Sequence, residues 1–379
     1  MTTQRREVLV SEVTALPLPR VVSDLPLSVG VEEEFLLVDA DSGKLLPLAP
    51  MVLGGVRTAL DLQQEMTLYQ VESATPVCRS MAEVRAQLMA ARGALSALAG
   101  SHGARIVATG TPVFSGVRPP PLADSDRYRT IAAEYGMLVD GLTICGCHVH
   151  IGIPDQETGV LISNHLRQWL PVLLAISANS PFAEGRDTGY ASSRYLAWSP
   201  WPSAGAPPWF ESAEDYHRHT QVLRTAGAAL DPAMVYWDVR LSARHPTVEL
   251  RVCDVAATVD EAVVLAALVR AIARTALDGR PAQRVPDLVL RTAMWRAARD
   301  GLDGAGIEPH TGRLVPAVDM VRSLVDWTRP ALRSVGDEDL VLDGLDRVLM
   351  DGTGAARQRR AYRRRESLLD VVEMLVAQT

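Results

Sequence analysis

Two glutamates spaced two residues apart are the first candidates for chemistry. They lie in residues 30–39, GVEEEFLLVD, whose apolar content is typical of a strand. Side chains of a strand alternate between its two faces, so Glu32 and Glu34 share one face and Glu33 points to the other. Two carboxylates on one face repel each other and need a cation, a shared proton or open solvent. A half-solvated edge strand remains the alternative for this stretch alone.

Two histidines share one face of a second expected strand, residues 143–153. The segment CGCHVHIG puts His148 and His150 beside Gly146 and Gly152, and glycines there let a ligand approach closely. A single histidine in such a strand is more often structural. Zinc is disfavoured because the neighbouring cysteines fall on the opposite face and one ion could not easily reach both.

A third strand, residues 247–253 (TVELRVC), carries a carboxylate and a guanidinium. Glu249, Arg251 and Cys253 form the face opposite the valines and leucine. The preceding strand, residues 234–242, adds Arg240 across the turn at 243–246. A surface ion pair is the alternative interpretation of this pattern.

Three strands that are apolar on one side and ionisable on the other form a consistent pattern. If they share a sheet, one face lines a cavity with Glu32, Glu34, His148, Glu249 and Arg251, which Glu65 and Glu72 could complete. Carboxylates with one imidazole suit Mg²⁺ or Mn²⁺, and arginines suit phosphate oxygens. This combination predicts phosphoryl transfer, in which metals and cations stabilise developing charge.

Composition limits the other function classes. The chain has 379 residues, 47% of them hydrophobic, which indicates a globular protein. A net charge of −7 argues against general nucleic-acid binding. The basic run 357–365 is expected to be a solvated helix face or to contact ATP phosphates in part. Lys44 is the only lysine, so no GxxxxGK phosphate loop is possible. With four cysteines and no apolar leader, we expect a reduced, cytoplasmic protein without a membrane span.

The order of elements predicts an α+β fold with a mainly antiparallel sheet, since strands are scattered among helices and hairpin turns. We expect a tail at residues 1–26 and one catalytic domain at residues 27–379. Ser80 and Glu83 form a capping box that opens a helix. Residues 182–209 lack periodicity, and a loop of this length is usually functional. The expected helices are 80–98, 125–139, 160–178 with a kink at Pro171, 260–277, 287–299, 317–334 and 366–378.

Six strings in order resemble the carboxylate–amine ligase family, also called type 2 glutamate–cysteine ligases. They are GVEEEFLLVD, QVESATPVC, CGCHVHIG, NSPFAEGRDTGYASSR, YWDVRLSARHPTVELRVCDV and DGTGAARQR. The similarity covers nearly the whole chain after residue 26. The family belongs to the glutamine synthetase-like superfamily. The resemblance therefore implies a mainly antiparallel sheet that forms a funnel-shaped active site flanked by helices, and ATP-dependent amide formation through a γ-glutamyl phosphate.

The resemblance also implies two metal sites. Glu32 and Glu34 match a pair that holds two different Mg²⁺ ions, with Mn²⁺ as the other candidate metal. One ion would be held by Glu34 with Glu65 and Glu72. The other would be held by Glu32 with His148 and Glu249.

The remaining assignments concern the substrates. Arg251 matches an arginine near the transferred phosphoryl group, and we assign it with Glu249 to catalysis. Arg194, Arg186 and His150 are assigned to the substrate, with Arg194 at the α-carboxylate. Arg240, with Arg251, is assigned to nucleotide phosphate.

The implied partners are ATP, L-glutamate and a small amine, with cysteine as the family default and other amines left open. A homodimer is a further implication; nucleic acid and membrane are not expected. Two other functions remain open from the residues. A guanidino kinase would yield a phosphagen without free phosphate, whereas a ligase releases phosphate with ADP. A non-catalytic nucleotide binder would not need the full set of ionisable residues.

Overall fold

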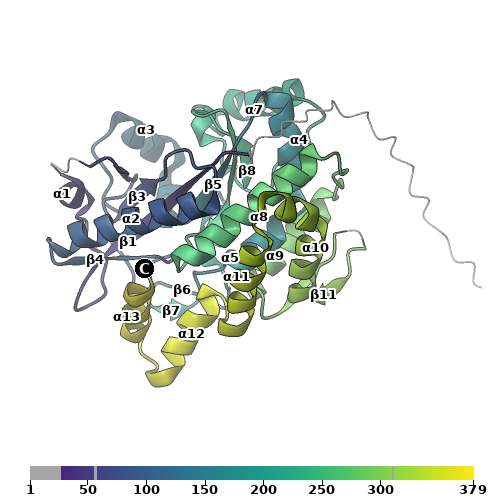
Figure 1. Ribbon diagram of the computed structural model, residues 1–379. Helices are drawn as coiled ribbons and strands as arrows, with labels where there is room; N and C mark the ends of the chain where they lie inside the picture. The colour runs from purple at the N-terminus through teal and green to yellow at the C-terminus, as the bar shows by residue number, and fades with distance from the viewer. Residues whose placement is uncertain (1–26, 55–57, 310) are drawn as a thin grey trace, which may run out of the picture.

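A single antiparallel sheet organises the fold. The structure is a computed structural model that describes residues 27–54, 58–309 and 311–379. Within these residues, seven strands form the main sheet in the order β2-β3-β1-β5-β9-β8, with β4 also paired to β1. The strands are β1 (Val29–Asp39), β2 (Asp61–Gln64), β3 (Gln70–Ala74), β4 (Ala104–Val107), β5 (Gly146–Gly152), β8 (Val239–Leu241) and β9 (Thr247–Asp254). The predicted α+β class and mainly antiparallel sheet are confirmed (Figure 1).

Strand β1 is central because it is long enough to pair with three others. Its first half pairs with β5, its middle with β3 and its last residues with β4. The expected alternation holds: Glu32 and Glu34 line a pocket on one face, whereas Glu33 is fully buried on the other.

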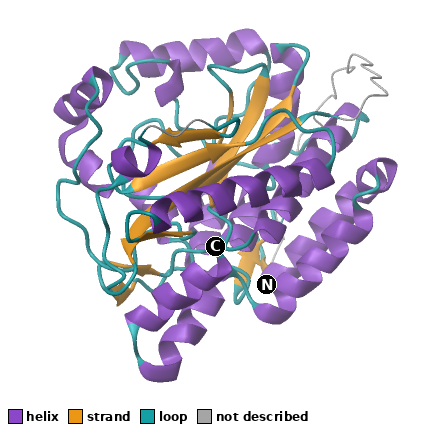
Figure 2. Ribbon diagram, turned by 60° about the vertical axis from the view of Figure 1, so that its left-hand side comes forward, coloured by secondary structure: helices purple, strands orange, loops and turns teal. Residues whose placement is uncertain are grey.

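Helices pack against the face of the sheet that Glu33 occupies (Figures 1 and 2). The central one is α8 (Val259–Leu277), whose side chains are buried almost along its whole length. It packs beside α2 (Met81–Gly100), α4 (Gln156–Arg167) and α5 (Leu170–Ser177) on the strands β5 and β9. The burial of so many leucine, valine and alanine side chains is the main stabilising term of this core.

The remaining elements surround this core. The helices are α1 (Ala49–Leu53), α3 (Asp126–Tyr135), η1 (Gly136–Gly141), α6 (Ser193–Trp198), α7 (Ala213–Thr225), η2 (Pro232–Met234), α9 (Asp287–Asp300), α10 (Ala317–Val335), α11 (Glu338–Asp351), α12 (Gly354–Arg365) and α13 (Leu368–Gln378). Two small hairpins pair β6 (Phe182–Ala183) with β7 (Arg186–Asp187), and β10 (Ala305–Ile307) with β11 (Leu314–Pro316). No helix in the described ranges combines the length and apolarity needed to cross a membrane.

Several local expectations are confirmed and others are corrected. Ser80 caps α2 by accepting the Glu83 backbone N–H at 3.2 Å, as the capping box predicts. The helix expected to kink at Pro171 is instead two helices, α4 and α5. Pro171 lies in the first turn of α5, where its missing N–H costs nothing. The segment 182–209 contains the β6–β7 hairpin and α6, and the tail expected at 1–26 lies outside the described residues.

Candidate active site

Strand register brings the predicted site residues face to face. Glu32 pairs with His148 across β1 and β5, and Glu34 pairs with Glu72 across β1 and β3. Glu249 on β9 pairs with His150 on β5. Directly opposite side chains in antiparallel strands are close enough to interact, so the sheet itself assembles the cluster.

A bulge in β9 re-aims one of the expected side chains. Val149 pairs with Leu250, but Cys147 pairs with Cys253, so β9 has one residue more than β5 in this interval, opposite His148. Such bulges bend a strand and are common beside active sites. The alternation therefore breaks after Arg251. Cys253, expected on the cavity face, instead contacts the Leu173 carbonyl of α5 and is fully buried.

Glu32, His148 and Glu249 form a cluster that could hold one cation. One ligand atom from each lies within 4.8 Å of the others, and no other such trio is found in the described part of the chain. His148 Nδ1 lies 3.1 Å from Glu32 Oε2, while its Nε2 is buried without a hydrogen-bond partner. Burial and the nearby Arg251 guanidinium lower the pKa of His148 to about 4. The imidazole is then neutral at pH 7, which is the form that binds a metal.

Glu249 is held by two arginines. Arg240 donates from Nε to Oε2 at 2.8 Å and from Nη2 to Oε1 at 3.0 Å, and Arg251 also donates to Oε1. Burial acts to raise the pKa of Glu249, but the two guanidinium groups outweigh it and hold the pKa well below its usual range. Glu249 therefore stays ionised, with one Oε2 lone pair left for a further partner.

The same contacts occupy Arg240. Its Nη1 donates to the Ala233 carbonyl at 2.6 Å and the Val235 carbonyl at 2.9 Å. With the two bonds to Glu249, four of the five N–H groups of Arg240 donate to these protein groups, and one is left over. Arg240 lines the pocket, as the sequence led us to expect, but its guanidinium is engaged with protein groups.

A second acidic group lies beside the first. Burial and then Glu65 raise the pKa of Glu34 to about 7, although Glu34 also accepts the Gly146 backbone N–H at 2.6 Å. The pKa of Glu72 is raised by burial and by Glu65 as well. Buried carboxylates that repel each other are stabilised by a shared cation. The charge pattern therefore fits a divalent ion, although these three residues do not meet the 4.8 Å spacing of the trio.

The pKa values of the two histidines of β5 are shifted in opposite directions. His150 lies with Nδ1 2.8 Å from Thr247 Oγ1 and Nε2 3.2 Å from Glu32 Oε1. Burial acts to lower the pKa of His150, but the Glu32 hydrogen bond and the Glu249 charge outweigh it and raise the pKa. The side chain of His245, on the β8–β9 turn, meets His150 edge to face at 6.2 Å. The imidazole of His150 lines the pocket, where its ring N–H could be donated to an anionic group of a ligand.

Arg194 is a further cation of the pocket, and no carboxylate in the described part of the chain is hydrogen-bonded to it. It follows the N-cap Ser192 in α6 and is 5% exposed. Its two terminal nitrogens donate to the Val252 and Arg251 carbonyls at 3.3 Å, and its Nε has no partner. Its guanidinium passes over Gly146, where any β-carbon would collide with it. Such a buried guanidinium can bind a carboxylate of a ligand by donating hydrogen bonds to it.

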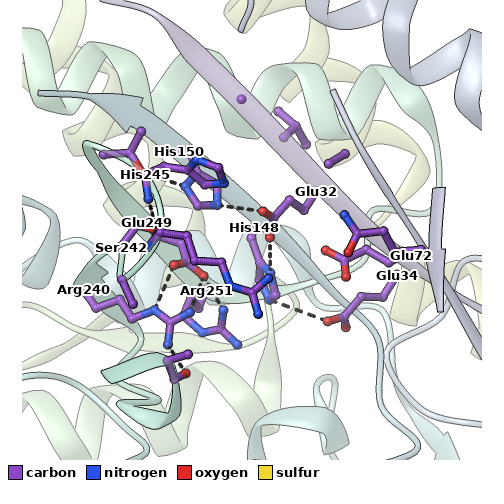
Figure 3. A pocket seen from close by; sticks show the side chains of 18 of the residues that line it. Glu32, Glu34, Glu72, His148, His150, Arg240, Ser242, His245, Glu249 and Arg251 are labelled. Carbon is purple, nitrogen blue, oxygen red and sulfur yellow. Dashed lines mark hydrogen bonds and ion pairs between the residues drawn. The ribbon is translucent and has the colours of Figure 1, made fainter. Parts of the chain in front are cut away.

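These groups line one pocket with a cavity of about 690 Å³ (Figure 3). Its centre holds the acidic, imidazole and arginine side chains. Its lining also includes the aromatic residues Tyr128, Trp198 and Tyr236, and the β8–β9 turn with His245. In Figure 3, Glu34 and Glu72 lie on one side of His148, and Arg240 with Glu249 on the other.

The structure does not bring every expected residue to the pocket, and it adds others. Arg186 lies exposed in the β6–β7 hairpin and is not part of the lining. Arg127 and Tyr128 of α3 do line the pocket, as does Tyr236. Sequence analysis missed Arg127 and Tyr128 because they lie on a short helix, where no strand alternation marks the face that a side chain takes. Tyr236 falls in the strand expected at 234–242, on the same face as Arg240, but the observed strand β8 covers only Val239–Leu241.

The chain is similar to known proteins over most of its length. The sequence pattern of glutamate–cysteine ligase family 2 matches residues 28–374. A Saccharopolyspora erythraea protein named as a candidate glutamate–cysteine ligase 2-1 is 45% identical over 358 residues, 94% of this chain and 95% of the relative. A similarly named Mycobacterium protein, 2-2, is 47% identical over 360 residues, 93% of this chain and 98% of the relative.

Solved structures share the fold at low sequence identity. The glutamate–cysteine ligase of Francisella tularensis in complex with AMP has a TM-score of 0.67 at 16% identity, with 93% of this chain and 89% of that chain covered. A bifunctional glutathione synthetase of Pasteurella multocida has a TM-score of 0.64 at 15% identity. In that second case the match covers 93% of this chain but only 52% of the other.

Proposed function

The chain belongs to glutamate–cysteine ligase family 2, and from this premise we propose that it joins the γ-carboxylate of L-glutamate to an amine, with cysteine as the amine. Membership of the family makes it an ATP-dependent ligase of the glutamate–cysteine ligase kind. The observation that carries the proposal is the cluster of Glu32, His148 and Glu249 beside Arg251 and Arg194 in one pocket.

The side chains of the pocket suit divalent metal ions. Glu32, neutral His148 and the remaining lone pair of Glu249 would hold one ion, and Glu34 with Glu65 and Glu72 would hold another. Oxygen ligands with one imidazole fit Mg²⁺ or Mn²⁺. When bound, such ions neutralise charge on phosphate oxygens. The orphan Nε2 of His148 and the repulsion among the second group of carboxylates support this assignment.

In the first proposed step, a γ-carboxylate oxygen of glutamate attacks the γ-phosphorus of ATP. The bond between that phosphorus and the bridging oxygen breaks, ADP leaves and γ-glutamyl phosphate forms. Arg251, held in place by Glu249, stabilises the charge on the transferring phosphoryl oxygens. Arg240 also holds Glu249, so we propose that it orients this metal ligand, with its one remaining N–H group left for a nucleotide phosphate.

In the second step, the amine nitrogen attacks the acyl carbon, the bond from this carbon to the phosphate oxygen breaks, and inorganic phosphate leaves while the proton of the nitrogen passes to solvent water. Arg194 binds the α-carboxylate of glutamate and so holds the acyl phosphate in the pocket during the attack. We assign His150, which also lines the pocket, to an anionic group of the substrates. Arg186 has no part in this proposal, because it lies exposed outside the pocket lining.

A hydroxamate assay tests the proposal without a choice of amine. Hydroxylamine is a small nucleophile that traps an activated γ-carboxylate as a hydroxamate. We expect hydroxamate, ADP and phosphate in equal amounts from glutamate, Mg·ATP and hydroxylamine. Formation of ADP without hydroxamate and without phosphate would instead indicate a kinase. No glutamate-dependent product at all would contradict the ligase assignment.

A further inference from the structure

Arg92 is a buried arginine behind the strand that carries the two pocket glutamates. It lies on α2, is 3% exposed and contacts Glu33, which is fully buried. Arg92 Nε donates to Glu33 Oε2 at 3.0 Å, and Nη2 donates to Oε1 at 2.6 Å. Glu33 separates Glu32 from Glu34 in sequence, so this ion pair fixes the backbone between two proposed metal ligands from behind.

The same guanidinium reaches a second part of the sheet. Arg92 Nη2 also donates to the Ala256 carbonyl at 2.8 Å, and Nη1 donates to the Ala257 carbonyl at 3.3 Å. Ala256 and Ala257 lie two and three residues after the end of β9, the strand of Glu249 and Arg251. Strand β5 lies between β1 and β9 in the sheet, so Arg92 links β1 to the segment that leaves β9, a strand with which β1 does not pair.

Stability alone gives a weak reason for this ion pair. Removing two charges from water is costly, and replacing a buried pair by apolar residues of similar size is often neutral or stabilising. Arg92 also stacks 5.2 Å from the centre of the Phe35 ring, so a long apolar side chain there would still be packed. The planar fork of a guanidinium, in contrast, fixes several acceptors in one geometry that apolar side chains cannot fix.

We propose that Arg92, with Glu33, is a positioning pair that sets the distance between the metal ligands on β1 and the ligand on β9. The proposal rests on the metal site assigned under the proposed function. It assigns no contact between Arg92 and any substrate; the pair acts through the backbone of the two strands. Partners that orient metal ligands from outside the site affect metal affinity by about 10–100-fold.

The test uses Mn²⁺ alone as the probe, with free Mn²⁺ measured by electron paramagnetic resonance in titrations of the full chain. The main variant is Arg92→Met/Glu33→Leu, which removes both charges together and leaves no buried ion unpaired. The matched control is Arg270→Met/Asp337→Leu, which removes another buried ion pair between α8 and the start of α11. Thermal unfolding of each variant is measured in the same buffer without metal.

We expect the Arg92/Glu33 variant to keep an unfolding temperature close to that of the control and to bind Mn²⁺ about tenfold more weakly than the wild type. The control should bind Mn²⁺ like the wild type. The proposal would be overturned if the Arg92/Glu33 variant bound Mn²⁺ as tightly as the wild type. It would also be overturned if both double variants lost the same amount of Mn²⁺ affinity. If the wild type itself binds no Mn²⁺, the metal site of the proposed function fails instead.

A second variant keeps the proposal testable should the double variant not fold. Arg92→Lys keeps the buried charge, but a single ammonium cannot span Glu33 and both carbonyls. We expect it to fold and to bind Mn²⁺ several-fold more weakly. Wild-type affinity in Arg92→Lys would show that charge alone is sufficient and would contradict a role for the span of the guanidinium.

Discussion

Glu249 is bonded to both Arg240 and Arg251. Removal of Arg251 and removal of Glu249 should therefore affect activity and stability differently. Arg251→Ala leaves Glu249 paired with Arg240, so the fold should be retained. Loss of one electrostatic contact to the reacting group should lower kcat about 10²–10³-fold. Steady-state phosphate release by Arg251→Ala measures this effect, and turnover at the wild-type rate would rule out the assigned role.

Glu249→Ala should destabilise the fold as well as remove activity, unlike Arg251→Ala. It leaves Arg240 and Arg251 buried without their carboxylate, and breaking such a pair costs about 3–5 kcal/mol. We therefore expect loss of activity together with a lower free energy of unfolding. Urea unfolding measures this change. A midpoint of the variant equal to that of the wild type would contradict the prediction.

Asp238 gives the free energy of unfolding a dependence on pH. Burial raises the pKa of Asp238 to about 7, and its Oδ2 has no hydrogen-bond partner in the described residues. The folded state thus binds a proton that the unfolded state releases near pH 4. Because the folded state binds more protons, stability falls as the pH rises from about 4 to about 7.

Asp238→Asn should remove this dependence, because asparagine stays neutral. Relative to the wild type, the variant should gain about 2–3 kcal/mol of stability between pH 5 and pH 8, since each pKa unit corresponds to about 1.4 kcal/mol. Urea unfolding at both pH values measures the difference. A stability gain of Asp238→Asn that is present at pH 5 and disappears at pH 8 would contradict the raised pKa of Asp238.

At this scale the sequence was informative where strand alternation applies. The face shared by Glu32 and Glu34, and the one shared by His148 and His150, follow from a period of two, and all four residues line the pocket. Cys253 could not be placed, because a bulge breaks the period without a local sequence signal. Arg186 and Arg194 lie close together in one irregular segment, so nothing local told which of them points into the pocket.

At the scale of elements, β5 must leave room for a side chain from α6. A β-carbon at Gly146 would collide with the Arg194 guanidinium. Gly146→Ala should therefore displace Arg194 and raise the KM for glutamate about 10-fold or more, as expected for a lost hydrogen bond to a charged group. Steady-state kinetics with glutamate varied at saturating ATP measures it.

Gly93→Ala provides the control for this prediction. Gly93 lies exposed in α2, and a β-carbon added there would meet no neighbouring side chain or element within 4 Å. Alanine should stabilise this helix by about 0.5–1 kcal/mol and leave the KM for glutamate unchanged. The assignment of Arg194 fails if Gly146→Ala and Gly93→Ala show the same KM.

The elements themselves were predictable in part. Long helices with clear periodicity or caps, such as α2, α8 and α10, lie within a few residues of their expected bounds. Helix α11 was not anticipated. The basic run 357–365 was expected as a helix face and lies in α12, but its arginines form ion pairs such as the one between Arg359 and Asp187, which sequence spacing does not show.

At the scale of the whole molecule, nucleotide and metal should stabilise the fold together. A ligand that binds only the folded state at about 100 times its Kd adds about 2.7 kcal/mol to the free energy of unfolding. We expect Mg·ATP to raise the thermal unfolding temperature and excess EDTA to remove most of this increase. An equal increase with ATP in EDTA would contradict a metal-dependent nucleotide site.

The overall topology could be inferred from the sequence only through resemblance. Alternation predicts that three strands share a sheet face, but it does not give the order β2-β3-β1-β5-β9-β8, because pairing between distant strands depends on contacts that are far apart in the chain. The similarity of six strings implied a mainly antiparallel sheet with a funnel-shaped active site, but it did not give the order of the strands.

The central claim is that the pocket joins glutamate to an amine with ATP. The most direct test follows ADP and phosphate together, with Mg·ATP, glutamate and a panel of amines led by cysteine. We expect phosphate release that requires both glutamate and cysteine, equal in amount to the ADP formed. Release with a different amine only would keep the mechanism and replace cysteine. ADP and phosphate formed at the same rate with and without glutamate would contradict the claim.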